Sequence, residues 1–490
     1  MKFASALSLL FAAGAANAAS YSVCSGKTDG LGISAVAFSE DPVVPGSTLT
    51  IKVDATPTVD ITDGATLTFD ILLGPITISS VEKDVCSDLG VTCPLPAGKS
   101  QSISVDVDVS ASAPAASVTA QVTTKNGDGS SVSCVNIPLT VSSTLPLTLS
   151  HEVELTTELV DSLFTTFKSQ FNKVYDSDEE HAMRRNHFEA SLKRIQEKNS
   201  VLGSSPNFGV TKFSDMSPAE FKHKMLNYKP LVAHDDISRI NAETHSAVSR
   251  KLRGKKSFAA TASDKDWRDD GAVTAVKDQG QCGSCWAFST TEGIESAFFL
   301  SGYELTELSV EQIVQCDTED AGCNGGDTIA AYDYIQEAEG LATESDYPYT
   351  SGRGVTGKCN DNFSVVEGTN VASWKYATPA CTTRKCEDQD EDTLAATLHD
   401  VAPPSICVNA ESWQDYTTGV LKGSSCGGNG YYSLDHCVQL IGYSGISGNN
   451  GYWIVRNSWA DDWGVDGMIH LEYGANTCGV ADEATVVTLK

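Results

Sequence analysis

The chain has 490 residues, of which 34 are Lys or Arg and 64 are Asp or Glu, so its formal net charge is −30. The length predicts about three domains. The acidic balance argues against nucleic acid or an anionic membrane surface as a partner, because phosphate contacts need clustered Lys and Arg. Hydrophobic residues make up 41% of the chain, too many for a disordered acidic protein. Because the 15 cysteines are an odd number, at least one thiol stays unpaired in an oxidising compartment.

The N-terminus carries a targeting pattern. Lys2 is followed by an apolar stretch from Phe3 to Ala16, and residues 16–18 have the small side chains of a signal-peptide cleavage site. The stretch is too short for an anchoring helix. We therefore expect residues 1–18 to be removed and the protein to be secreted or delivered to the lysosome or vacuole. Secretion permits disulfides, and the sequon that begins at Asn362 predicts a glycan.

The acidity is uneven along the chain. Residues 262–490 contain 11 basic and 36 acidic residues, whereas residues 151–261 contain 17 basic and 15 acidic residues. Polar segments around residues 142–146 and 230–263 are typical of linkers. We expect four parts after the signal peptide: a domain over 19–145, a second region over 155–230, a linker and activation region over 231–263, and a last domain over 264–490.

The first domain is predicted to be an all-β sandwich. Apolar and polar residues alternate in short runs between Ser47 and Val141, and turn-forming clusters separate the runs. Four cysteines allow three pairings, of which Cys86 with Cys93 and Cys24 with Cys134 is the most economical. Residues 19–150 contain neither His nor Trp, so binding is a better prediction than catalysis for this domain.

The cysteine spacing of this domain, together with its segments 41–46 and 93–98, resembles the ML lipid-recognition domains. The resemblance implies an immunoglobulin-like sandwich that holds a lipid tail between two splayed sheets lined by aliphatic residues. The alternative is a sandwich whose interior is filled by its own side chains.

The second region is predicted to contain a long helix, because residues 177–202 include neither Gly nor Pro. Six of its residues recur at steps of three or four and share one helical face: Glu180, Arg184, Phe188, Ser191, Ile195 and Asn199. Alone, this is an ordinary amphipathic helix. The pattern is similar to the helical signature of papain-family propeptides, with Ser191 where the family usually has Asn, and residues 209–215 resemble the second propeptide signature. The resemblance implies an α-rich inhibitory prosegment that lies backwards through the cleft of its own protease.

The last domain contains the candidate nucleophile. Cys285 begins a predicted helix over residues 286–300, and the positive end of a helix dipole stabilises a thiolate. A thiolate is a nucleophile if a base lies near it; the alternative is that Cys285 is half of a disulfide. Residues 262–490 contain three histidines. His399 is expected on a solvated helix face and His470 within a strand, whereas His436 precedes an apolar strand, but position alone leaves the choice open.

Residues 264–490, with Cys-Gly-Ser-Cys-Trp at 282–286, resemble the papain-family, cathepsin-like cysteine proteases. The resemblance implies a two-lobed α+β fold in which a helical lobe lies beside a β-barrel lobe. The activity that it implies is peptide-bond hydrolysis through an acyl-enzyme, with no metal and no cofactor.

The same resemblance assigns roles to residues. Cys285 is the nucleophile, His436 its ion-pair partner and general acid, and Asn457 the residue that orients the imidazole. The side chain of Gln279 and the backbone N–H of Cys285 would hold the oxyanion of the tetrahedral intermediate. Trp459 would cover the hydrogen bond between His436 and Asn457.

The resemblance also implies a disulfide framework for the eleven cysteines of this domain. The pairs that it implies are Cys282–Cys323, Cys316–Cys359 and Cys426–Cys478. Cys381 and Cys386 could close a local insertion. Cys407 and Cys437 remain, at positions that line the S2 pocket, which receives the second residue before the scissile bond. The hypothesis is that these two are bonded, which leaves Cys285 as the free thiol.

The expected substrate-binding residues follow from the same comparison. Gly325 and Gly326 resemble the backbone stretch that pairs with an extended substrate, and Asp327 and Thr328 follow them. Glu483 falls at the base of the S2 pocket. Relatives with Glu there accept Arg as well as bulky apolar residues, so a dual preference is expected. The alternative is that Glu483 turns out into solvent.

Taken together, these patterns predict a monomeric cysteine endopeptidase zymogen preceded by a lipid-binding domain. Its partners would be protein and peptide substrates, its own prosegment and a lipid. Maturation near residues 259–263 would detach the lipid domain together with the prosegment. The basic residues of the prosegment can pair with the acidic protease, and protonation of carboxylates would weaken that pairing. The alternative function is a lipid carrier or sensor with an accessory protease domain.

Overall fold

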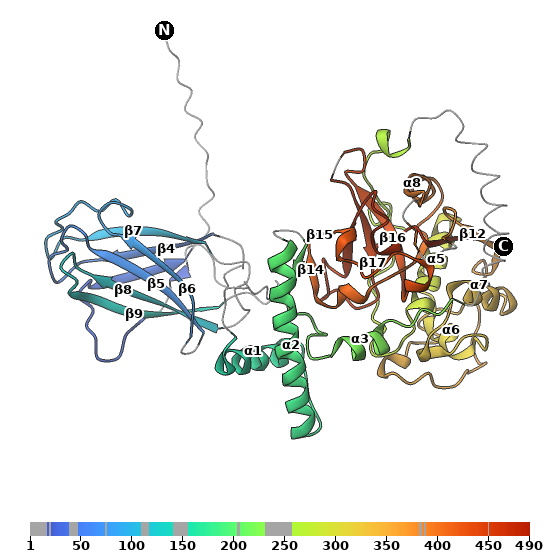
Figure 1. Cartoon of the computed structure of the whole chain (residues 1–490), viewed down its shortest axis with the longest axis horizontal. Coiled ribbons are helices and arrows are strands. Elements are labelled where there is room, and N and C mark those ends of the chain that lie inside the picture. The colour runs from blue at the N-terminus through green and yellow to red at the C-terminus, as the bar shows by residue number, and fades with distance from the viewer. Residues whose placement is uncertain are drawn as a thin grey trace, which may run out of the picture. The chain divides into compact units, whose positions relative to one another are not determined.

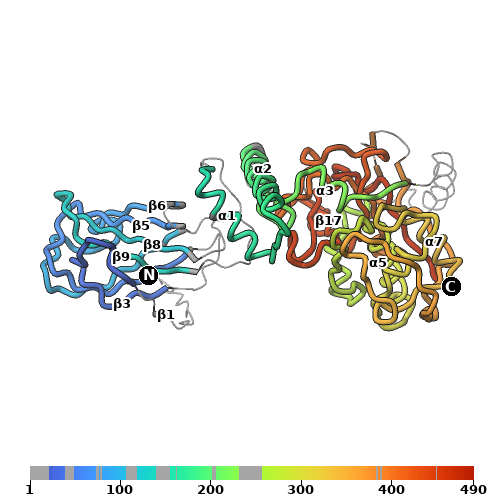
Figure 2. The backbone as a smooth tube through the Cα atoms, turned by 90° about the horizontal axis from the view of Figure 1, so that it is seen from below, coloured from blue at the N-terminus to red at the C-terminus, as the bar shows by residue number. Residues whose placement is uncertain are grey.

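The chain divides into two compact units, residues 1–185 and 186–490. A computed structural model describes residues 17–18, 21–38, 48–73, 76–108, 117–140, 155–202, 206–230, 257–381, 385–386, 389–448 and 450–490. Most of the predicted signal peptide and of the predicted linker, residues 1–16 and 231–256, lies outside the described residues, as does the polar segment 142–146. Figures 1 and 2 show each unit in two orientations.

The first unit contains the predicted sandwich. Its strands are β1 (Asn17–Ala18), β2 (Ser22–Val23), β3 (Ile33–Phe38), β4 (Thr48–Ala55), β5 (Thr66–Leu73), β6 (Ile76–Asp84), β7 (Gln101–Asp108), β8 (Ser117–Lys125) and β9 (Ser131–Thr140). They form two antiparallel sheets in the orders β1-β3-β4-β7 and β2-β9-β8-β5-β6, which lie face to face in Figure 1. The predicted alternation is confirmed in β4, where Leu49, Ile51 and Val53 are buried between the sheets. The disulfides Cys24–Cys134 and Cys86–Cys93 close this unit as expected.

Two helices follow the sandwich. They are α1 (Thr157–Gln170), whose N-cap Thr156 accepts a hydrogen bond from the Leu159 backbone, and α2 (Asp178–Leu202). Helix α2 matches the predicted long helix, and the boundary between the two units falls within it. On the predicted face, Phe188, Ser191 and Ile195 are fully buried, which confirms that this face packs against the protein.

The second unit contains the rest of the chain. Its helices are α3 (Pro218–Met225), α5 (Cys285–Leu300), α6 (Val310–Cys316), α7 (Thr328–Glu337) and α8 (Glu391–Asp400), with short 3₁₀ turns that include η4 (Glu411–Asp415) and η6 (Tyr431–Ser433). Its strands are β10 (Asn207–Phe208), β11 (Lys265–Asp266), β12 (Val371–Tyr376), β13 (Ser405–Val408), β14 (Tyr416–Thr418), β15 (Val420–Leu421), β16 (His436–Ser444), β17 (Tyr452–Arg456), β18 (Met468–Glu472) and β19 (Glu483–Leu489).

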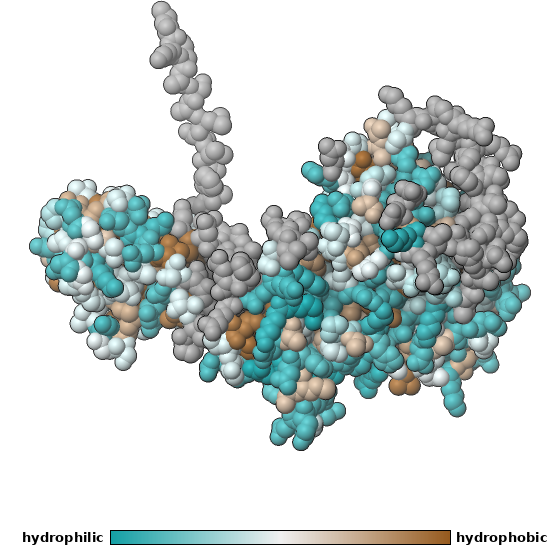
Figure 3. All heavy atoms as spheres, in the orientation of Figure 1, coloured by the Kyte–Doolittle hydropathy of each residue, from teal (hydrophilic) through white to brown (hydrophobic). Residues whose placement is uncertain are grey.

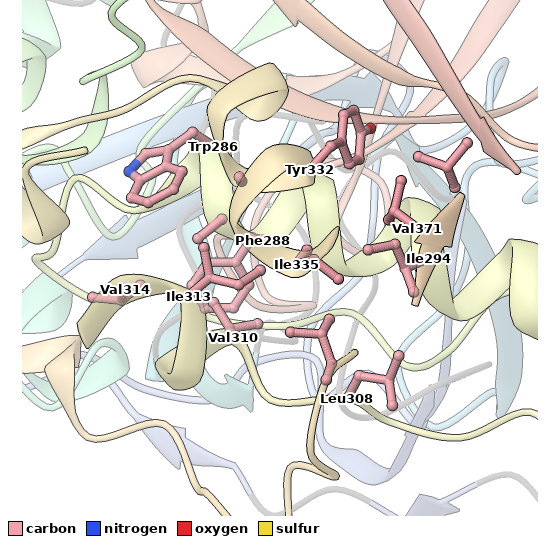
Figure 4. Packing of buried hydrophobic residues seen from close by; sticks show 14 of the residues in the cluster. Trp286, Phe288, Ile294, Leu308, Val310, Ile313, Val314, Tyr332, Ile335 and Val371 are labelled. Carbon is pink, nitrogen blue, oxygen red and sulfur yellow. The ribbon is translucent and has the colours of Figure 1, made fainter. Parts of the chain in front are cut away.

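A helical part and a sheet part make up most of this unit. The sheet has the order β12-β19-β13-β16-β17-β18-β15, with β11 paired to β16, and is antiparallel except between β15 and β18. Figure 4 shows the helical core, in which Trp286 and Ile294 of α5 pack with Ile313 of α6, Ile335 of α7 and Val371 of β12. Helix α5 is buried from its first residue through Phe298, so the side chain at its start has a rigid support.

The acidic composition of the second unit leads us to expect a hydrophilic surface. On the face shown in Figure 3, hydrophilic side chains cover most of the described surface of the second unit. Among the described residues, no helix combines the length and the apolar character needed to cross a membrane.

Candidate active site

Cys285 is the first residue of α5, and the loop before it is fixed by several contacts. The Cys282–Cys323 disulfide and the hydrogen bond from Gly283 N to the Cys323 carbonyl (3.0 Å) hold the loop against the helical part. A Cβ at Gly283 would lie 2.6 Å from the Cys323 carbonyl oxygen, so glycine is required for this close approach. The hydroxyls of Ser284 and Tyr349 hydrogen-bond each other at 2.8 Å.

His436 begins β16, opposite Val408 of β13, and is fully buried. Its Nε2 lies 2.8 Å from Oδ1 of Asn457. Because that oxygen can only accept, Nε2 carries the proton in the neutral ring and Nδ1 has the lone pair. Nδ1 has no hydrogen-bond partner within the described part of the chain. The ring of Trp459 lies over the imidazole at 4.9 Å between centroids, and Trp413 meets it edge-on at 6.0 Å.

Burial controls the charge of this pair in the zymogen. It raises the pKa of the Cys285 thiol to about 11, although hydrogen bonds with the backbone of Cys437 and Asn227 partly oppose the shift. Burial also lowers the pKa of His436 to about 4, against the opposing effect of the Asn457 hydrogen bond. In this state the loss of hydration outweighs the preference of the helix dipole for the thiolate.

Gln279, six residues before Cys285 in the chain, is held by both ends of its amide. Its Oε1 accepts hydrogen bonds from the Ser458 hydroxyl (2.7 Å) and the Trp459 indole (3.1 Å). Its Nε2 donates to the carbonyls of Cys282 (3.0 Å) and Met225 (3.2 Å). Since Met225 ends α3 of the prosegment, a prosegment carbonyl occupies one donor position of this amide.

The prosegment crosses the protease as an extended strand next to α3. Tyr228 forms a parallel bridge with Gly326, through hydrogen bonds from Lys229 N to Gly326 O (2.9 Å) and from Gly326 N to Asn227 O (3.3 Å). On the other side, Tyr228 N donates to the Asp435 carbonyl at 2.9 Å. The strand therefore lies between the glycine stretch and the residue that precedes His436.

At the expected S2 pocket, the side chain of Tyr228 packs in a buried cluster that includes Tyr376, Tyr431 and the Cys407–Cys437 disulfide. Tyr228 is 5% exposed, and its hydroxyl donates a hydrogen bond to Oε2 of Glu483. Glu483 itself is buried, so the alternative in which it turns out into solvent is wrong.

The other residues expected in this pocket are also buried. Asp327 accepts a hydrogen bond from Ile329 N at 2.9 Å and so caps α7, and Thr328 is the first residue of that helix. Gly325 has φ of +112°, a conformation that favours glycine. The structure thus brings the expected glycine stretch, Asp327 and Glu483 around one prosegment side chain.

The cysteines pair as the sequence predicts. In the second unit, the five disulfides are Cys282–Cys323, Cys316–Cys359, Cys381–Cys386, Cys407–Cys437 and Cys426–Cys478. Cys285 is the single free cysteine of the described residues.

Ion pairs join the prosegment to the protease outside the cleft. Arg194 donates to both oxygens of the Asp415 carboxylate, from Nε to Oδ2 and from Nη2 to Oδ1, at 2.7 Å each. Lys198 Nζ lies 2.8 Å from Oδ2 of the same carboxylate. Asp415 is fully buried, and these two cations lower its pKa despite the burial. Lys212 lies 2.6 Å from Asp462 at a more exposed position.

The remaining candidates lie away from the nucleophile. The side chain of His399 is 40% exposed and pairs with Asp400, and His470 lies in β18 against the Tyr452 ring. Asn362 is exposed, as a glycan acceptor must be. Functional neighbours that the sequence did not reveal are Ser458, Trp413, Tyr349, Tyr376, Tyr431 and Asp415. Of these, Ser458 follows Asn457 directly and could have been suspected, whereas the others come from distant segments.

Comparisons with known proteins match each part of the chain. Residues 18–141 match the family described as "ML domain", residues 164–221 the "Cathepsin propeptide inhibitor domain (I29)", and residues 261–488 the "Papain family cysteine protease".

Individual relatives agree with these matches. "Cysteine proteinase 1" of Dictyostelium discoideum is 37% identical over 341 residues, which cover 66% of this chain and 90% of that protein. "Cysteine proteinase" of Trypanosoma brucei brucei is 38% identical over 66% of this chain and 65% of its own length. Among solved structures, procathepsin L2 from Tenebrio molitor matches with a TM-score of 0.55 and 29% identity, covering 67% of this chain and 100% of that one. The recombinant stem bromelain precursor gives a TM-score of 0.54 and 28% identity over 68% and 99%. The chain therefore belongs to the papain family of cysteine proteases, as a zymogen in which an ML domain precedes the propeptide.

Proposed function

We propose that the chain is the zymogen of a cysteine endopeptidase in which Cys285, His436, Asn457 and Gln279 carry the chemistry. The observation that carries this proposal is the hydrogen bond from His436 Nε2 to Asn457, which leaves Nδ1 without a partner in the described residues. The single free cysteine of the described residues, Cys285, begins a buried helix and is the thiol that Nδ1 could serve. Once the prosegment leaves, water re-enters and a proton moves from the Cys285 thiol to His436 Nδ1, because hydration favours the ion pair.

In this mechanism the thiolate attacks the carbonyl carbon of the substrate and forms a tetrahedral intermediate. Gln279 Nε2, which donates to the Met225 carbonyl in the zymogen, donates to the oxyanion together with the backbone N–H of Cys285. His436 gives its proton to the leaving amine, and an acyl-enzyme remains. Water, deprotonated by His436, then attacks the thioester and releases the acid. Trp459, with its ring over the imidazole, keeps solvent from the Asn457 bond.

Thiol alkylation tests this proposal through its dependence on pH. With a pKa of about 11, Cys285 of the latent zymogen is ionised in only about one molecule in a thousand at pH 8. Its reaction with iodoacetamide is therefore expected to rise about tenfold per pH unit between pH 7 and 9. The activated enzyme is expected to react at a nearly constant rate between pH 5 and 8, with one equivalent incorporated and peptide mapping that places it on Cys285. Equal rates for zymogen and activated enzyme at pH 6 would contradict the proposal.

The specificity proposal rests on the pocket that Tyr228 fills, which we assign as the S2 pocket. The apolar wall supports acceptance of Leu and Phe there, and Glu483 would accept Arg or Lys only in its ionised form. Gly325 and Gly326 would pair with the substrate backbone, since the prosegment strand already bonds to Gly326.

We further propose that the ML domain binds a lipid tail and so targets or tethers the zymogen, with domain limits near 19–145, 155–230, 231–263 and 264–490. The aliphatic inner faces of the two sheets support this role. We expect the full-length zymogen to bind a fluorescent long-chain fatty acid that a non-fluorescent phospholipid displaces, with no binding by the processed protease. Equal binding by both forms would place the lipid elsewhere. The presence of Cys285, His436, Asn457 and Gln279 in the chain disfavours the alternative of a lipid carrier with an accessory protease.

We place the protein in the secretory pathway, as a secreted or a lysosomal or vacuolar enzyme. Seven disulfides support an oxidising compartment, since disulfides rarely persist in the cytosol. The exposed position of Asn362 supports glycosylation.

A further inference from the structure

The base of the S2 pocket is polar, although its wall is apolar. Glu483 begins β19 opposite Cys407 of β13 and is only 2% exposed. The charged groups that face its carboxyl are Asp327, at the start of α7, and its chain neighbour Asp482. Both are carboxylates, so they oppose rather than offset a negative charge on Glu483.

This arrangement favours the protonated form of Glu483. Burial, the carboxylate of Asp327 and that of Asp482 raise the pKa of Glu483 well above its usual range, and the Tyr228 hydrogen bond opposes the shift only in part. A protonated carboxyl group is neutral and can both donate and accept a hydrogen bond. A phenol hydroxyl also does both, whereas a guanidinium only donates and needs an ionised partner.

A second hydroxyl at this base has an unused hydrogen-bonding capacity. Tyr376 is 1% exposed, and its hydroxyl has no hydrogen-bond partner among the described residues. Tyr376 and Tyr431 lie in the same buried cluster as Tyr228, and Glu483 and Asp327 both act electrostatically on the two tyrosines. A purely apolar side chain in the pocket would give neither the Tyr376 hydroxyl nor Oε2 of Glu483 a hydrogen bond, and buried polar groups without partners are costly.

The prosegment shows which side chain satisfies this base. Tyr228 is the prosegment residue in the pocket, and its hydroxyl bonds to Glu483. The prosegment backbone pairs with Gly326 in the parallel direction, and a substrate need not run in the same direction. The Tyr228 side chain nevertheless shows which chemical groups the pocket accepts.

We propose that the S2 pocket selects tyrosine as the second residue before the scissile bond, through a hydrogen bond between the phenol hydroxyl and Glu483. This inference rests on the proposed protease function and names its substrate class more narrowly. Phenylalanine fits the same wall but leaves the carboxyl unpaired, and arginine requires Glu483 to ionise beside Asp327 and Asp482.

Matched peptides test the selection on activated enzyme prepared from the full chain. The substrates differ only at the second residue before the cut, which is Tyr, Phe, Leu or Arg, and each enzyme concentration is set by thiol titration. Wild type is expected to cleave the Tyr peptide with a kcat/KM about 10- to 100-fold above that for the Phe peptide. Glu483→Leu is expected to reduce this ratio to about one, and Glu483→Gln, which still accepts a hydrogen bond, is expected to retain part of it. A wild-type ratio below about three, or a ratio that Glu483→Leu leaves unchanged, would overturn the inference.

The zymogen offers a second measurement that does not depend on Glu483 variants. Tyr228→Phe removes only the hydroxyl in the pocket, and is expected to speed autoactivation about tenfold at a fixed pH. The matched control is Tyr432→Phe, because Tyr432 is 67% exposed. Equal rates for the two variants would overturn the inference. If no variant titrates with a thiol reagent or cleaves any peptide, the proposed protease function itself has failed; cleavage without preference for Tyr contradicts the selection alone.

Discussion

Replacing Cys285 by Ala is expected to lower kcat/KM for every peptide substrate by roughly 10⁵-fold, because it removes the nucleophile on which the acyl-enzyme route depends. Alone in acid, the Cys285→Ala zymogen is expected to stay at full length. On addition of a trace of active wild-type enzyme it is expected to be cut, which shows that it is folded and accessible. Gel electrophoresis and peptide hydrolysis check the two expectations.

A matched pair of histidine variants, His436→Ala and His399→Ala, serves as the control for this prediction. His436→Ala is expected to reduce activity on a similar scale, since neither the thiolate nor the leaving amine then has its proton partner. His399→Ala is expected to change kcat/KM less than about twofold, because that side chain is 40% exposed and its contacts in the described part of the chain are with Asp400 and the Phe258 ring. A Cys285→Ala protein with more than about 1% activity that a thiol reagent blocks would refute the assignment of the nucleophile.

The proposed catalytic residues could be named from the sequence because their signals are local. Cys285 lies in a contiguous motif, and the helix that follows it was expected from periodicity. The histidine was harder: His399, His436 and His470 could not be separated by position, and the family resemblance made the choice. The structure supports that choice, since of these three described histidines His436 is the one that is fully buried with its Nε2 on an asparagine.

Other features could not be predicted because they depend on which distant segments meet. Tyr376 and Tyr431 come from β12 and η6, and no sequence spacing relates them to Glu483. The protonation state of Cys285 was also beyond the sequence. A helix N-terminus predicts a thiolate, but the size of the opposing effect depends on burial under the prosegment, which only the folded zymogen shows.

The charge imbalance predicted an electrostatic contact between prosegment and protease without saying where it lies. In the structure, a large part of this contact lies at Asp415, a buried carboxylate that accepts two hydrogen bonds from Arg194 and one from Lys198. Around it, Thr211 donates to the Gln414 carbonyl at 2.7 Å, and the Gln414 amide donates to the Phe213 carbonyl at 3.0 Å. Asp415 is therefore the centre of the main contact outside the cleft.

The direction of the pKa shift decides how this contact responds to acid. The pKa of Asp415 is lowered in the complex, so its contribution to prosegment binding is fully present above the ordinary Asp value and is lost only as pH falls through the lowered value. Mild acid down to about pH 4 therefore leaves the contact charged. We propose that acidification starts activation by protonating other carboxylates, and activation that is unchanged between pH 4 and 7 would contradict this proposal.

Asp415→Asn is expected to weaken the hold of the prosegment by about 2–4 kcal/mol, or roughly 30- to 1,000-fold, because two cations lose their buried partner. The onset of activity on acidification of the full-length zymogen is then expected at a higher pH than in wild type, and latency near pH 7 is expected to be incomplete. Thiol titration of samples held at fixed pH values measures the active fraction. Asp462→Asn is the matched control: it also removes one carboxylate that pairs with a prosegment lysine, but at a site that is 52% exposed, where an ion pair contributes about 0–1 kcal/mol. If the pH at which activity begins shifts equally in both variants, the Asp415 contact is only one of several interchangeable ion pairs. If the shift is confined to Asp415→Asn, the buried carboxylate is the contact that holds the prosegment on the protease.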